Sequence, residues 1–294
     1  MKQITIEFPK DWTEYELLDS GDGKKLERFG PYRVVRPDPR ILWKRNRPEK
    51  DWNEADASFI RSDQTTGRWE MRRNIPNSWT VRHGRTVFNL KPTEFKHLGV
   101  FPEQASNWNW IQDKIRNNPL KILNLFAYTG GATLEAAQNG GIVTHVDSVR
   151  STIAWAKENA RSSGLSAAPI RWIEDDAYKF VLREGRRNSL YDGVIMDPPR
   201  FGRGAKGEVW KLEEDLPRLL AAIRAILVPH PRFLLINAYT ADVSSIVLRQ
   251  LLTDALETDE GTIESGELAL KESSSDRLLP SGIFARWSSR ITTD

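Results

Sequence analysis

Two adjacent glycines stand where an apolar run of strand length gives way to small, helix-forming residues. The apolar run covers residues 122–127, and the glycines are Gly130 and Gly131. Glycines at such a turn let backbone N–H groups approach a ligand that any Cβ would hold off, and the following helix presents its positive end there. The stretch therefore predicts a strand, a ligand-binding turn and a helix. An alternative is that the glycines serve only the steric needs of an α/β loop.

A second apolar run, residues 142–146, ends in Asp147, sixteen residues after Gly131. An acidic residue at the tip of the second strand of a βαβ unit is placed to accept hydrogen bonds from ribose hydroxyls. The glycine turn and Asp147 together predict a nucleoside pocket.

A third strand, predicted over residues 191–197, runs directly into Asp197, Pro198 and Pro199. The prolines fix the backbone and carry no N–H donor, so carboxylate and carbonyl oxygens remain as acceptors. Such a corner suits a substrate that brings N–H donors.

These motifs occur in the order and at the distances of a known family. They read Asn-Leu-Phe-Ala-Tyr-Thr-Gly-Gly at 124–131, Val-Asp at 146–147 and Asp-Pro-Pro-x-Phe at 197–201. Together they resemble the S-adenosylmethionine-dependent methyltransferases of the group that modifies large-subunit ribosomal RNA. Residues 99–107 are similar to that group's Gly-Phe-Phe-Leu-Asp-Gln segment, which in the family lies against the cofactor just before the first strand. The matches cover residues 96–240.

The resemblance implies an α/β fold: a Rossmann-like class I methyltransferase sheet, parallel with an antiparallel C-terminal hairpin, plus a small N-terminal β-rich domain. We expect the β-rich domain over residues 1–95 and the methyltransferase domain over residues 96–294. The implied cofactor is S-adenosyl-L-methionine. The glycines would make room for its methionine part, Asp147 would hold the ribose and Asp176 the adenine. The expected cofactor-binding residues are Phe101, Glu103, Gln104, Phe126, Tyr128, Thr129, Gly130, Gly131, Asp147, Ser148, Asp175, Asp176, Ala177 and Asp197.

The acceptor corner is expected to do the chemistry. The resemblance places Asp197, Pro198 and Phe201 against the methyl acceptor, with Phe201 stacked on a base turned out of its helix. Candidate substrate contacts are Arg200, Arg203, Lys206 and Asn237. An arginine after Asp-Pro-Pro departs from the small or polar residues frequent in the family, which leaves the acceptor's identity open. Asp176 has a second possible role, as the N-cap of a helix over residues 177–186.

The chain contains no cysteine. Part of the resembled family methylates carbon 5 of cytosine through a thiol adduct, and this chain lacks the thiol. A base nitrogen of RNA is therefore the expected acceptor, guanine or adenine in particular. The four histidines are scattered without ligand spacing, so we expect no metal site.

Composition and charge fit a globular protein: 39% of the 294 residues are hydrophobic and 28% are charged, with a net charge of +3. The sequence has no apolar run of 18 residues and no charged-then-apolar leader. We therefore expect no membrane association and a cytoplasmic location.

The front of the chain predicts short strands at residues 32–35, 41–44, 79–82 and 86–90, with polar loops at 17–30 and 36–40. Its tryptophans and arginines could bind RNA by stacking and phosphate contacts, or could simply form a core. Downstream, strands and helices alternate, which predicts a parallel sheet. Helices are expected at 107–116, 151–163, 177–186, 210–227 and 244–256, strands at 170–173, 233–236, 264–271 and 283–288, and a flexible basic loop at 202–207.

Three other interpretations remain possible. A nicotinamide dehydrogenase shares the nucleoside pocket, but Gly-x-Gly-x-x-Gly does not follow the first strand. A methyltransferase acting on a protein or small molecule would keep the same cofactor residues. A catalytically silent RNA-binding protein would keep the basic loops without needing the cofactor.

Overall fold

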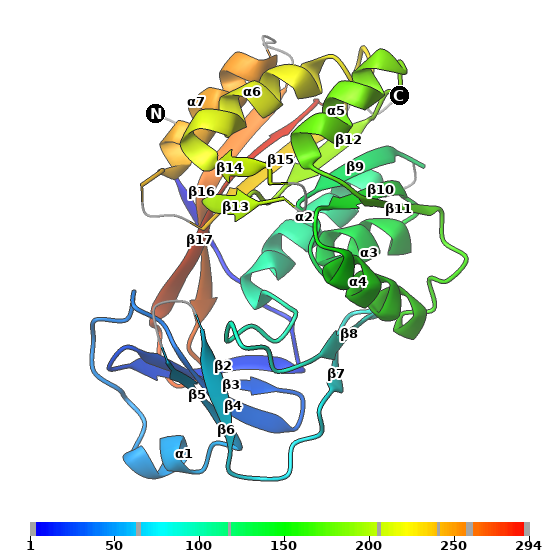
Figure 1. The fold of residues 1–294 in the computed structure, drawn as a ribbon. Coiled ribbons are helices and arrows are strands. Elements are labelled where there is room, and N and C mark those ends of the chain that lie inside the picture. Colours follow the sequence, from blue (N-terminus) through cyan, green and yellow to red (C-terminus); the bar gives the residue numbers. More distant parts are fainter. Residues whose placement is uncertain are drawn as a thin grey trace. The chain divides into compact units, whose positions relative to one another are not determined.

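The computed structural model describes residues 4–62, 66–116, 119–204, 207–239, 242–256 and 261–290 (Figure 1). Its contacts divide the chain into two compact units. The larger unit comprises Met1–Glu7, Ser106–Leu268 and Gly282–Asp294, and the smaller unit comprises Phe8–Ala105 and Ala269–Ser281.

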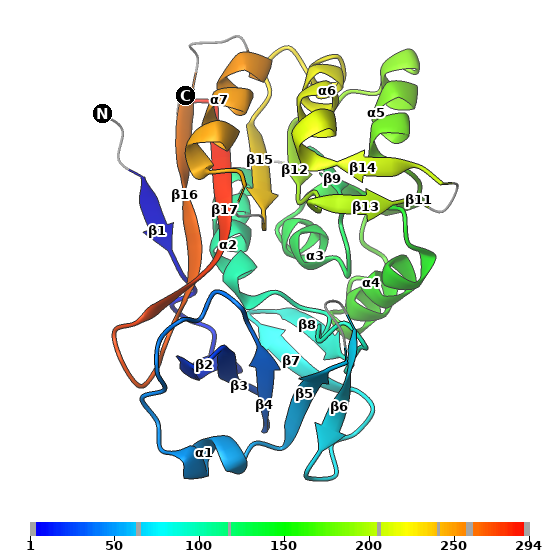
Figure 2. The same cartoon turned by 60° about the vertical axis from the view of Figure 1, so that its left-hand side comes forward.

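An eight-stranded sheet forms the larger unit, in the order β1-β16-β17-β15-β12-β9-β10-β11 (Figure 2). The central strands β9, β10, β11, β12 and β15 are parallel, and β17 runs antiparallel to β15. The predicted fold, a mostly parallel sheet ending in an antiparallel hairpin, is confirmed. The strands are β1 (Thr5–Glu7), β9 (Lys121–Leu125), β10 (Ile142–Asp147), β11 (Ile170–Glu174), β12 (Gly193–Met196), β15 (Phe233–Ala238), β16 (Thr262–Lys271) and β17 (Leu278–Ser288).

Helices cover both faces of this sheet, because successive residues of each buried strand point to opposite sides and both sides are apolar. Leu123 and Leu125 of β9 join the core beneath α5, α6 and α7, whereas Ile122 joins the core beneath α2 and α3. The two helix layers are visible in Figure 1. The helices are α2 (Ala105–Ile115), α3 (Gly131–Gln138), α4 (Arg150–Ser162), α5 (Ala177–Arg186), α6 (Leu212–Arg224) and α7 (Ser245–Leu256). A short hairpin, β13 (Phe201–Arg203) and β14 (Val209–Lys211), precedes α6.

The smaller unit is built on a five-stranded sheet in the order β2-β3-β4-β5-β6, with a separate β7–β8 ladder. The predicted β-rich character is confirmed. Its elements are β2 (Tyr15–Gly21), β3 (Lys24–Phe29), β4 (Tyr32–Pro37), α1 (Glu49–Asn53), β5 (Ala57–Arg61), β6 (Gly67–Met71), β7 (Trp79–His83), β8 (Thr86–Leu90) and the 3-10 helix η1 (Pro102–Gln104).

Several local expectations were wrong. The polar stretch 17–30 forms the β2–β3 hairpin rather than a loop, because Asp22 and Gly23 both adopt positive φ (50° and 74°) in a two-residue turn that suits paired strands. Residues 41–44 form no strand. The first residues of the expected basic loop at 202–207 belong to β13, which pairs with β14 beyond the end of that range. The helix predicted from residue 210 begins at Leu212, because Trp210 belongs to β14.

The units also divide the chain differently from the expected boundary at residue 95. Residues 96–105 and the hairpin tip, Ala269–Ser281, belong to the smaller unit, whereas Met1–Glu7 belongs to the larger one. The hairpin tip falls in the smaller unit because the last two strands are long, with 10 and 11 residues, and each has residues in both units.

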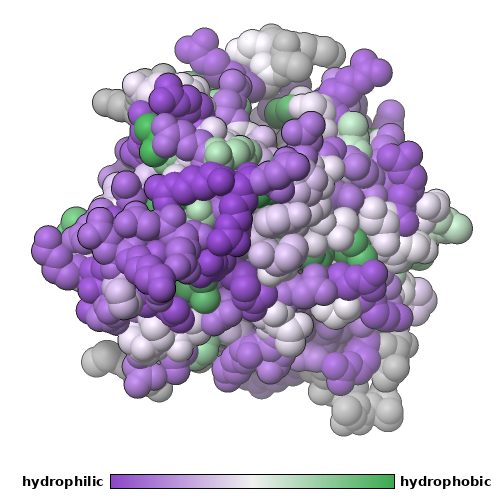
Figure 3. Space-filling model, turned by 90° about the horizontal axis from the view of Figure 1, so that it is seen from below, coloured by the Kyte–Doolittle hydropathy of each residue, from purple (hydrophilic) through white to green (hydrophobic). Residues whose placement is uncertain are grey.

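The molecular surface seen from below the view of Figure 1 is mostly hydrophilic, with hydrophobic side chains in small separate patches (Figure 3). Within the part of the chain that the structure describes, no helix is long and apolar enough to cross a membrane.

A buried ion pair holds the smaller unit's sheet together. Glu27 is fully buried and accepts hydrogen bonds from Nε and Nη2 of Arg36, at 2.7 and 2.8 Å, and from the Tyr15 hydroxyl at 3.0 Å. Burial alone would raise the pKa of Glu27, but Arg36 and Lys25 beside it hold that pKa below its usual value. The carboxylate is therefore charged and paired.

Glu27→Gln should lower the free energy of unfolding by about 3–5 kcal/mol, because it leaves the Arg36 guanidinium buried without an anion. Urea unfolding followed by tryptophan fluorescence measures this. The matched control is Glu70→Gln, whose partner Arg68 and own side chain are 74% and 47% exposed, and it should change stability by less than about 1 kcal/mol. Equal losses for the two variants would contradict the assignment.

Candidate functional site

The candidate site lies at the carboxyl ends of the parallel strands of the larger unit. Strand β9 pairs with β10 on one side and with β12 on the other, so the chain leaves β9 in one direction and returns on the opposite side. In open α/β sheets, ligands bind at such a reversal of strand order. The predicted Gly130, Asp147, Asp175 and Asp197 all follow or end these strands.

The turn after β9 holds a strained backbone. Phe126, Tyr128 and Gly130 all adopt left-handed φ, at 54°, 49° and 89°. This region is unfavourable for residues other than glycine, so the two aromatic residues together store a few kcal/mol of strain, about 1–3 kcal/mol each. Backbone bonds fix the turn, from Ala127 N to the Val146 carbonyl (3.1 Å) and from Gly130 N to the Ala127 carbonyl (3.0 Å). Strain held in this way marks a functional site more often than an ordinary connection.

The two glycines are needed for different reasons. A Cβ on Gly130 would lie 3.1 Å from Cβ of Ala156 and would sit on a left-handed backbone. A Cβ on Gly131 would come within 2.6 Å of Cζ2 of Trp108, so the tryptophan ring occupies the space that the missing side chain leaves. The steric alternative thus explains Gly131, and Trp108 is a packing residue of the turn that the sequence did not indicate.

A buried polar network supports the turn from below. Asn124 donates to the Thr133 hydroxyl, and Thr133 Oγ1 lies 2.9 Å from Nδ1 of His145. A threonine hydroxyl can accept two hydrogen bonds and donate one, so the direction of the Thr133–His145 hydrogen bond follows the tautomer of the histidine. Asn159 Nδ2 donates to the Thr129 carbonyl at 3.0 Å. All these side chains are almost fully buried, so the network fixes the turn's position.

Asp147 joins the turn to the following helix. Its Oδ2 accepts from the Tyr128 backbone N–H at 2.8 Å, and its Oδ1 accepts from the Val149 N–H at 2.9 Å and the Thr152 hydroxyl at 3.0 Å. Burial raises the pKa of Asp147, although these three hydrogen bonds oppose the rise. Three donors leave acceptor capacity on a carboxylate, which has about four lone-pair sites. Ser148, also expected here, follows Asp147 and is partly buried.

Two further acidic residues, Asp175 and Asp176, follow strand β11 at the same edge of the sheet. Asp175 N donates to the Asp147 carbonyl at 3.0 Å, and the Asp175 side chain pairs with Arg183. Asp176 caps α5, because its Oδ1 accepts from Lys179 N at 2.9 Å. The predicted N-cap role of Asp176 is therefore confirmed, and Ala177 after it is buried.

The Asp-Pro-Pro corner is held by two asparagines. Asn237 donates to Oδ1 of Asp197 at 2.9 Å, and Asn107 of α2 donates to Oδ1 of Asn237 at 3.5 Å. Asn237 thus positions the acidic side chain, and its expected contact with substrate stays a prediction. The sequence did not indicate this role for Asn107, which appeared there only as the last residue of the 99–107 motif.

The β13–β14 hairpin packs on this corner through Trp210, another residue missed from the sequence. Trp210 Nε1 donates to the Pro199 carbonyl at 2.7 Å, and its ring lies 4.8 Å from that of Phe126. Arg200 pairs with Asp242 and, at 3.9 Å, with Glu213, so its guanidinium is already engaged. Lys206 lies outside the described residues.

Phe101, Glu103 and Gln104 belong to the smaller unit and stay predictions as cofactor residues. Glu103 and Gln104 are buried in η1. Burial raises the pKa of Glu103, with Lys25 and Arg40 opposing the rise.

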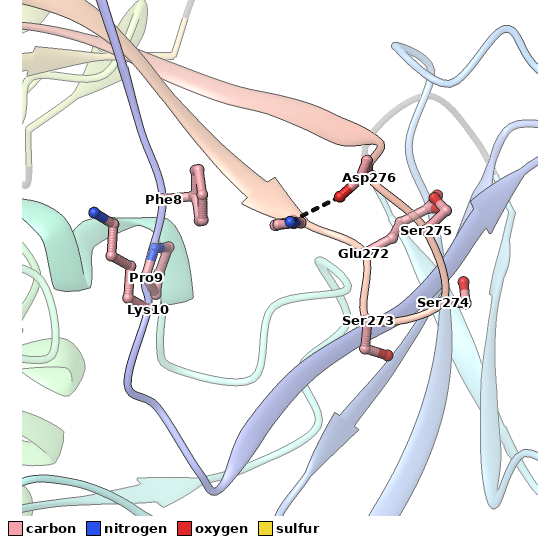
Figure 4. A pocket seen from close by; sticks show the side chains of 9 residues that line it. Phe8, Pro9, Lys10, Glu272, Ser273, Ser274, Ser275 and Asp276 are labelled. Atoms are coloured by element: carbon pink, nitrogen blue, oxygen red, sulfur yellow. Dashed lines mark hydrogen bonds and ion pairs between the residues drawn. The ribbon is translucent and has the colours of Figure 1, made fainter.

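The structure also contains a pocket that none of the predicted residues line. It has a volume of about 550 Å³ and lies in the smaller unit between residues 8–10 and the hairpin tip 271–276 (Figure 4). Lys271 and Asp276 form an ion pair of 2.9 Å beside it. In the described residues no group of three His, Asp or Glu side chains could hold a metal ion.

The sheet order, the strained glycine turn, the acid ending the second strand and the Asp-Pro-Pro corner define a Rossmann-like class I methyltransferase domain. A family model described as S-adenosylmethionine-dependent methyltransferase matches residues 61–255, and the chain belongs to that family. It is therefore an enzyme whose cofactor is S-adenosylmethionine.

Solved structures support the same fold. The SAM-dependent methyltransferase from Agrobacterium tumefaciens is 41% identical, with a TM-score of 0.93 over 97% of this chain and 94% of that one. A protein assigned as a SAM-dependent methyltransferase from Streptococcus mutans is 15% identical, with a TM-score of 0.75 over 95% of this chain and 76% of that one. At that identity the second likeness concerns the fold alone.

Curated relatives match a shorter region. Proteins named ribosomal RNA large subunit methyltransferase K/L from Shewanella frigidimarina and Shewanella baltica are each 30% identical over 152 residues, 51% of this chain. The chain spans about a fifth of the length of these relatives, because the match covers 21% of each.

The buried His145 should make stability depend on pH. Burial, with a smaller effect of Lys157, holds the pKa of His145 down at about 3, whereas the unfolded chain takes up the proton near pH 6.5. Between these values the unfolded state binds more protons, so the histidine's contribution is full above about pH 6.5 and is lost as the pH falls. His145→Gln should reduce the pH slope of the unfolding free energy by about 1.4 kcal/mol per pH unit between pH 6 and 4.

Urea unfolding at several pH values measures this slope. The control is His230→Gln, which removes an exposed histidine and should leave the slope as in the wild type. Parallel curves for wild type and His145→Gln would show that His145 does not titrate in this way.

Proposed function

We propose that this methyltransferase modifies a base nitrogen of RNA, ribosomal RNA in particular, at the Asp197 corner. The observation that carries the proposal is the arrangement of hydrogen-bond acceptors there. Asn237 fixes one oxygen of the Asp197 carboxylate at 2.9 Å, and the two prolines that follow bring no N–H donor. An exocyclic amino group is the acceptor that such a corner recognises.

The cofactor residues of the larger unit fit a nucleoside. Asp147 would accept hydrogen bonds from the ribose hydroxyls with the acceptor capacity that its three internal donors leave. The first turn of α3 follows Gly130, and its N–H groups lack partners within the helix, so they are suited to the carboxylate of the methionine part. Ser148, Asp175 and Ala177 would line the adenine side together with Asp176, whose capping bond uses one carboxylate oxygen.

Methyl transfer requires alignment more than covalent help. When bound, the cofactor supplies an electrophilic methyl group on a sulfonium. Asp197 would accept a hydrogen bond from the base amino group, which raises the electron density on the nitrogen and orients its lone pair. The nitrogen would gain the methyl group as the methyl carbon–sulfur bond breaks and leaves a thioether, and it would lose a proton toward the carboxylate or solvent. Phe201, next to the corner, would supply aromatic surface for a base.

RNA is favoured over other acceptors for two reasons. The curated relatives are named for ribosomal RNA, and the absence of cysteine removes the thiol route to cytosine carbon 5. A ribosomal RNA substrate would place the enzyme's work in the cytoplasm.

Asp147→Ala should weaken S-adenosylmethionine binding by about 10- to 100-fold, because hydrogen bonds to a charged group contribute about 1.5–3 kcal/mol. Isothermal calorimetry measures the affinity. Asp113→Ala removes an exposed acid of α2 and serves as the control, with an unchanged affinity expected. Circular dichroism of both variants checks folding, and a well-folded Asp147→Ala protein with wild-type affinity would refute the ribose contact.

Asp197→Ala should lower turnover by about 10²- to 10³-fold while S-adenosylmethionine affinity stays within about threefold of wild type. The assay is transfer of a labelled methyl group to ribosomal RNA from cells that lack the gene, followed by mass spectrometry of the nucleosides. Normal turnover in the variant would argue against Asp197, and labelling of protein instead of RNA would overturn the proposed substrate.

A further inference from the structure

The β13–β14 hairpin directly follows the acceptor corner and has two different faces. Its register pairs Phe201 with Lys211, Gly202 with Trp210, and Arg203 with Val209. Because opposite residues in an antiparallel pair share a face and successive residues along a strand do not, Gly202 and Trp210 lie on one face. Phe201, Arg203, Val209 and Lys211 lie on the other.

The inner face is fixed to the corner. Trp210 is 7% exposed, donates to the Pro199 carbonyl and packs on Phe126. A Cβ on Gly202 would lie 3.4 Å from Cγ of Pro199, so the hairpin rests on the proline ring. Leu212 N also donates to the Arg200 carbonyl at 3.0 Å, which ties the end of the hairpin to its beginning. The outer face is therefore held in a defined position beside Asp197.

The outer face combines apolar surface with positive charge. Phe201 and Val209 are each 53% exposed, and Arg203 and Lys211 are also exposed. Along each strand an apolar side chain and a cation are two residues apart, about 7 Å, and across the strands each apolar side chain faces a cation. Alternating stacking surface and cations is the arrangement that single-stranded nucleic acids require.

The two cations can exchange their present contacts for phosphate. Lys211 pairs with Glu214 at 2.9 Å, but the Glu214 side chain is 66% exposed, and ion pairs this exposed contribute little. Arg203 forms no ion pair with any described residue. Arg200 is not part of this surface, because it precedes the hairpin and pairs with two acids, Asp242 and Glu213.

We propose that the outer face of the β13–β14 hairpin binds the single-stranded RNA segment next to the methylated nucleotide. This rests on the proposed function. A base flanking the target stacks on Phe201 against Val209, and Arg203 and Lys211 contact the phosphates on either side of it. The Phe201 ring shares the outer face with the cations and lies on the opposite face from Trp210, which packs on the corner, so we assign it a flanking base in place of the target base expected from the sequence.

Two sets of variants test this surface, each with a matched control. Phe201→Ala removes the stacking ring, and its control is Ile246→Ala on α7, a residue with the same 53% exposure. Arg203→Glu with Lys211→Glu reverses both cations, and its control is Arg116→Glu, whose side chain is 71% exposed at the end of α2.

The first measurement is fluorescence anisotropy of a mixed-sequence 12-nucleotide single-stranded RNA in the presence of S-adenosylhomocysteine, with a duplex of the same sequence alongside. Phe201→Ala should weaken single-strand binding by about 5- to 100-fold. The charge-reversed variant should lower the slope of log affinity against log salt by about 1.4, since each phosphate contact on a single strand contributes about 0.7. Wild-type affinity in both variants, or tighter wild-type binding to the duplex, would overturn the inference.

The second measurement is methyl transfer to large-subunit ribosomal RNA from cells that lack the gene. The charge-reversed variant should show a KM raised about tenfold or more with kcat and S-adenosylmethionine affinity within about threefold of wild type. If the wild type methylates this RNA and the hairpin variants keep its KM, the surface is wrong and the proposed function stands. If the wild type methylates no RNA, the proposed function fails and this inference fails with it.

Discussion

The Asp147 carboxylate is the interaction on which the larger unit's site depends. Its hydrogen bond to Tyr128 N holds a turn that contains two left-handed aromatic residues, and its bonds to Val149 and Thr152 begin α4. The same residue's backbone carbonyl accepts from Asp175 N, so the loops after three neighbouring strands meet at one residue. A residue that joins three loops, and whose carboxylate retains acceptor capacity, would couple the shape of the proposed pocket to its recognition of a ligand.

The buried network beneath the turn has a different task. Asn124, Thr133 and His145 form a chain of hydrogen bonds in a region that apolar residues could have filled. Directional hydrogen bonds in such a chain restrict how its members can be arranged, whereas apolar side chains can repack. Such a network favours a single position for the strained turn. Asn237, on the strand next to Asp197, holds the Asp197 side chain in place in a similar way. Buried amide side chains therefore position both the glycine turn and the Asp-Pro-Pro corner.

Local pattern was sufficient to predict the parallel sheet, because β9, β10, β12 and β15 are short apolar runs bounded by turn residues. It failed where distant partners decide the outcome. Residues 17–30 read as a loop because Glu27 is polar, yet Arg36 makes its burial possible. Trp210 read as the start of a helix, and its place in β14 depends on the Pro199 carbonyl. In the site, motif residues were predictable from their types, whereas the supporting Asn107 and Trp108 were visible only once α2 was packed against the sheet.

The hairpin tip, Ala269–Ser281, contributes to the smaller unit, although most of that unit comes from the first 105 residues. Glu272, in the hairpin tip, accepts hydrogen bonds from Ser20 N at 2.9 Å and from the Ser275 hydroxyl at 2.6 Å, and all three residues belong to the smaller unit. During synthesis on the ribosome, Ser20 of β2 is made some 250 residues before Glu272, whose carboxylate it binds. The sheet of the smaller unit therefore gains this hydrogen bond only after the hairpin tip has been synthesised.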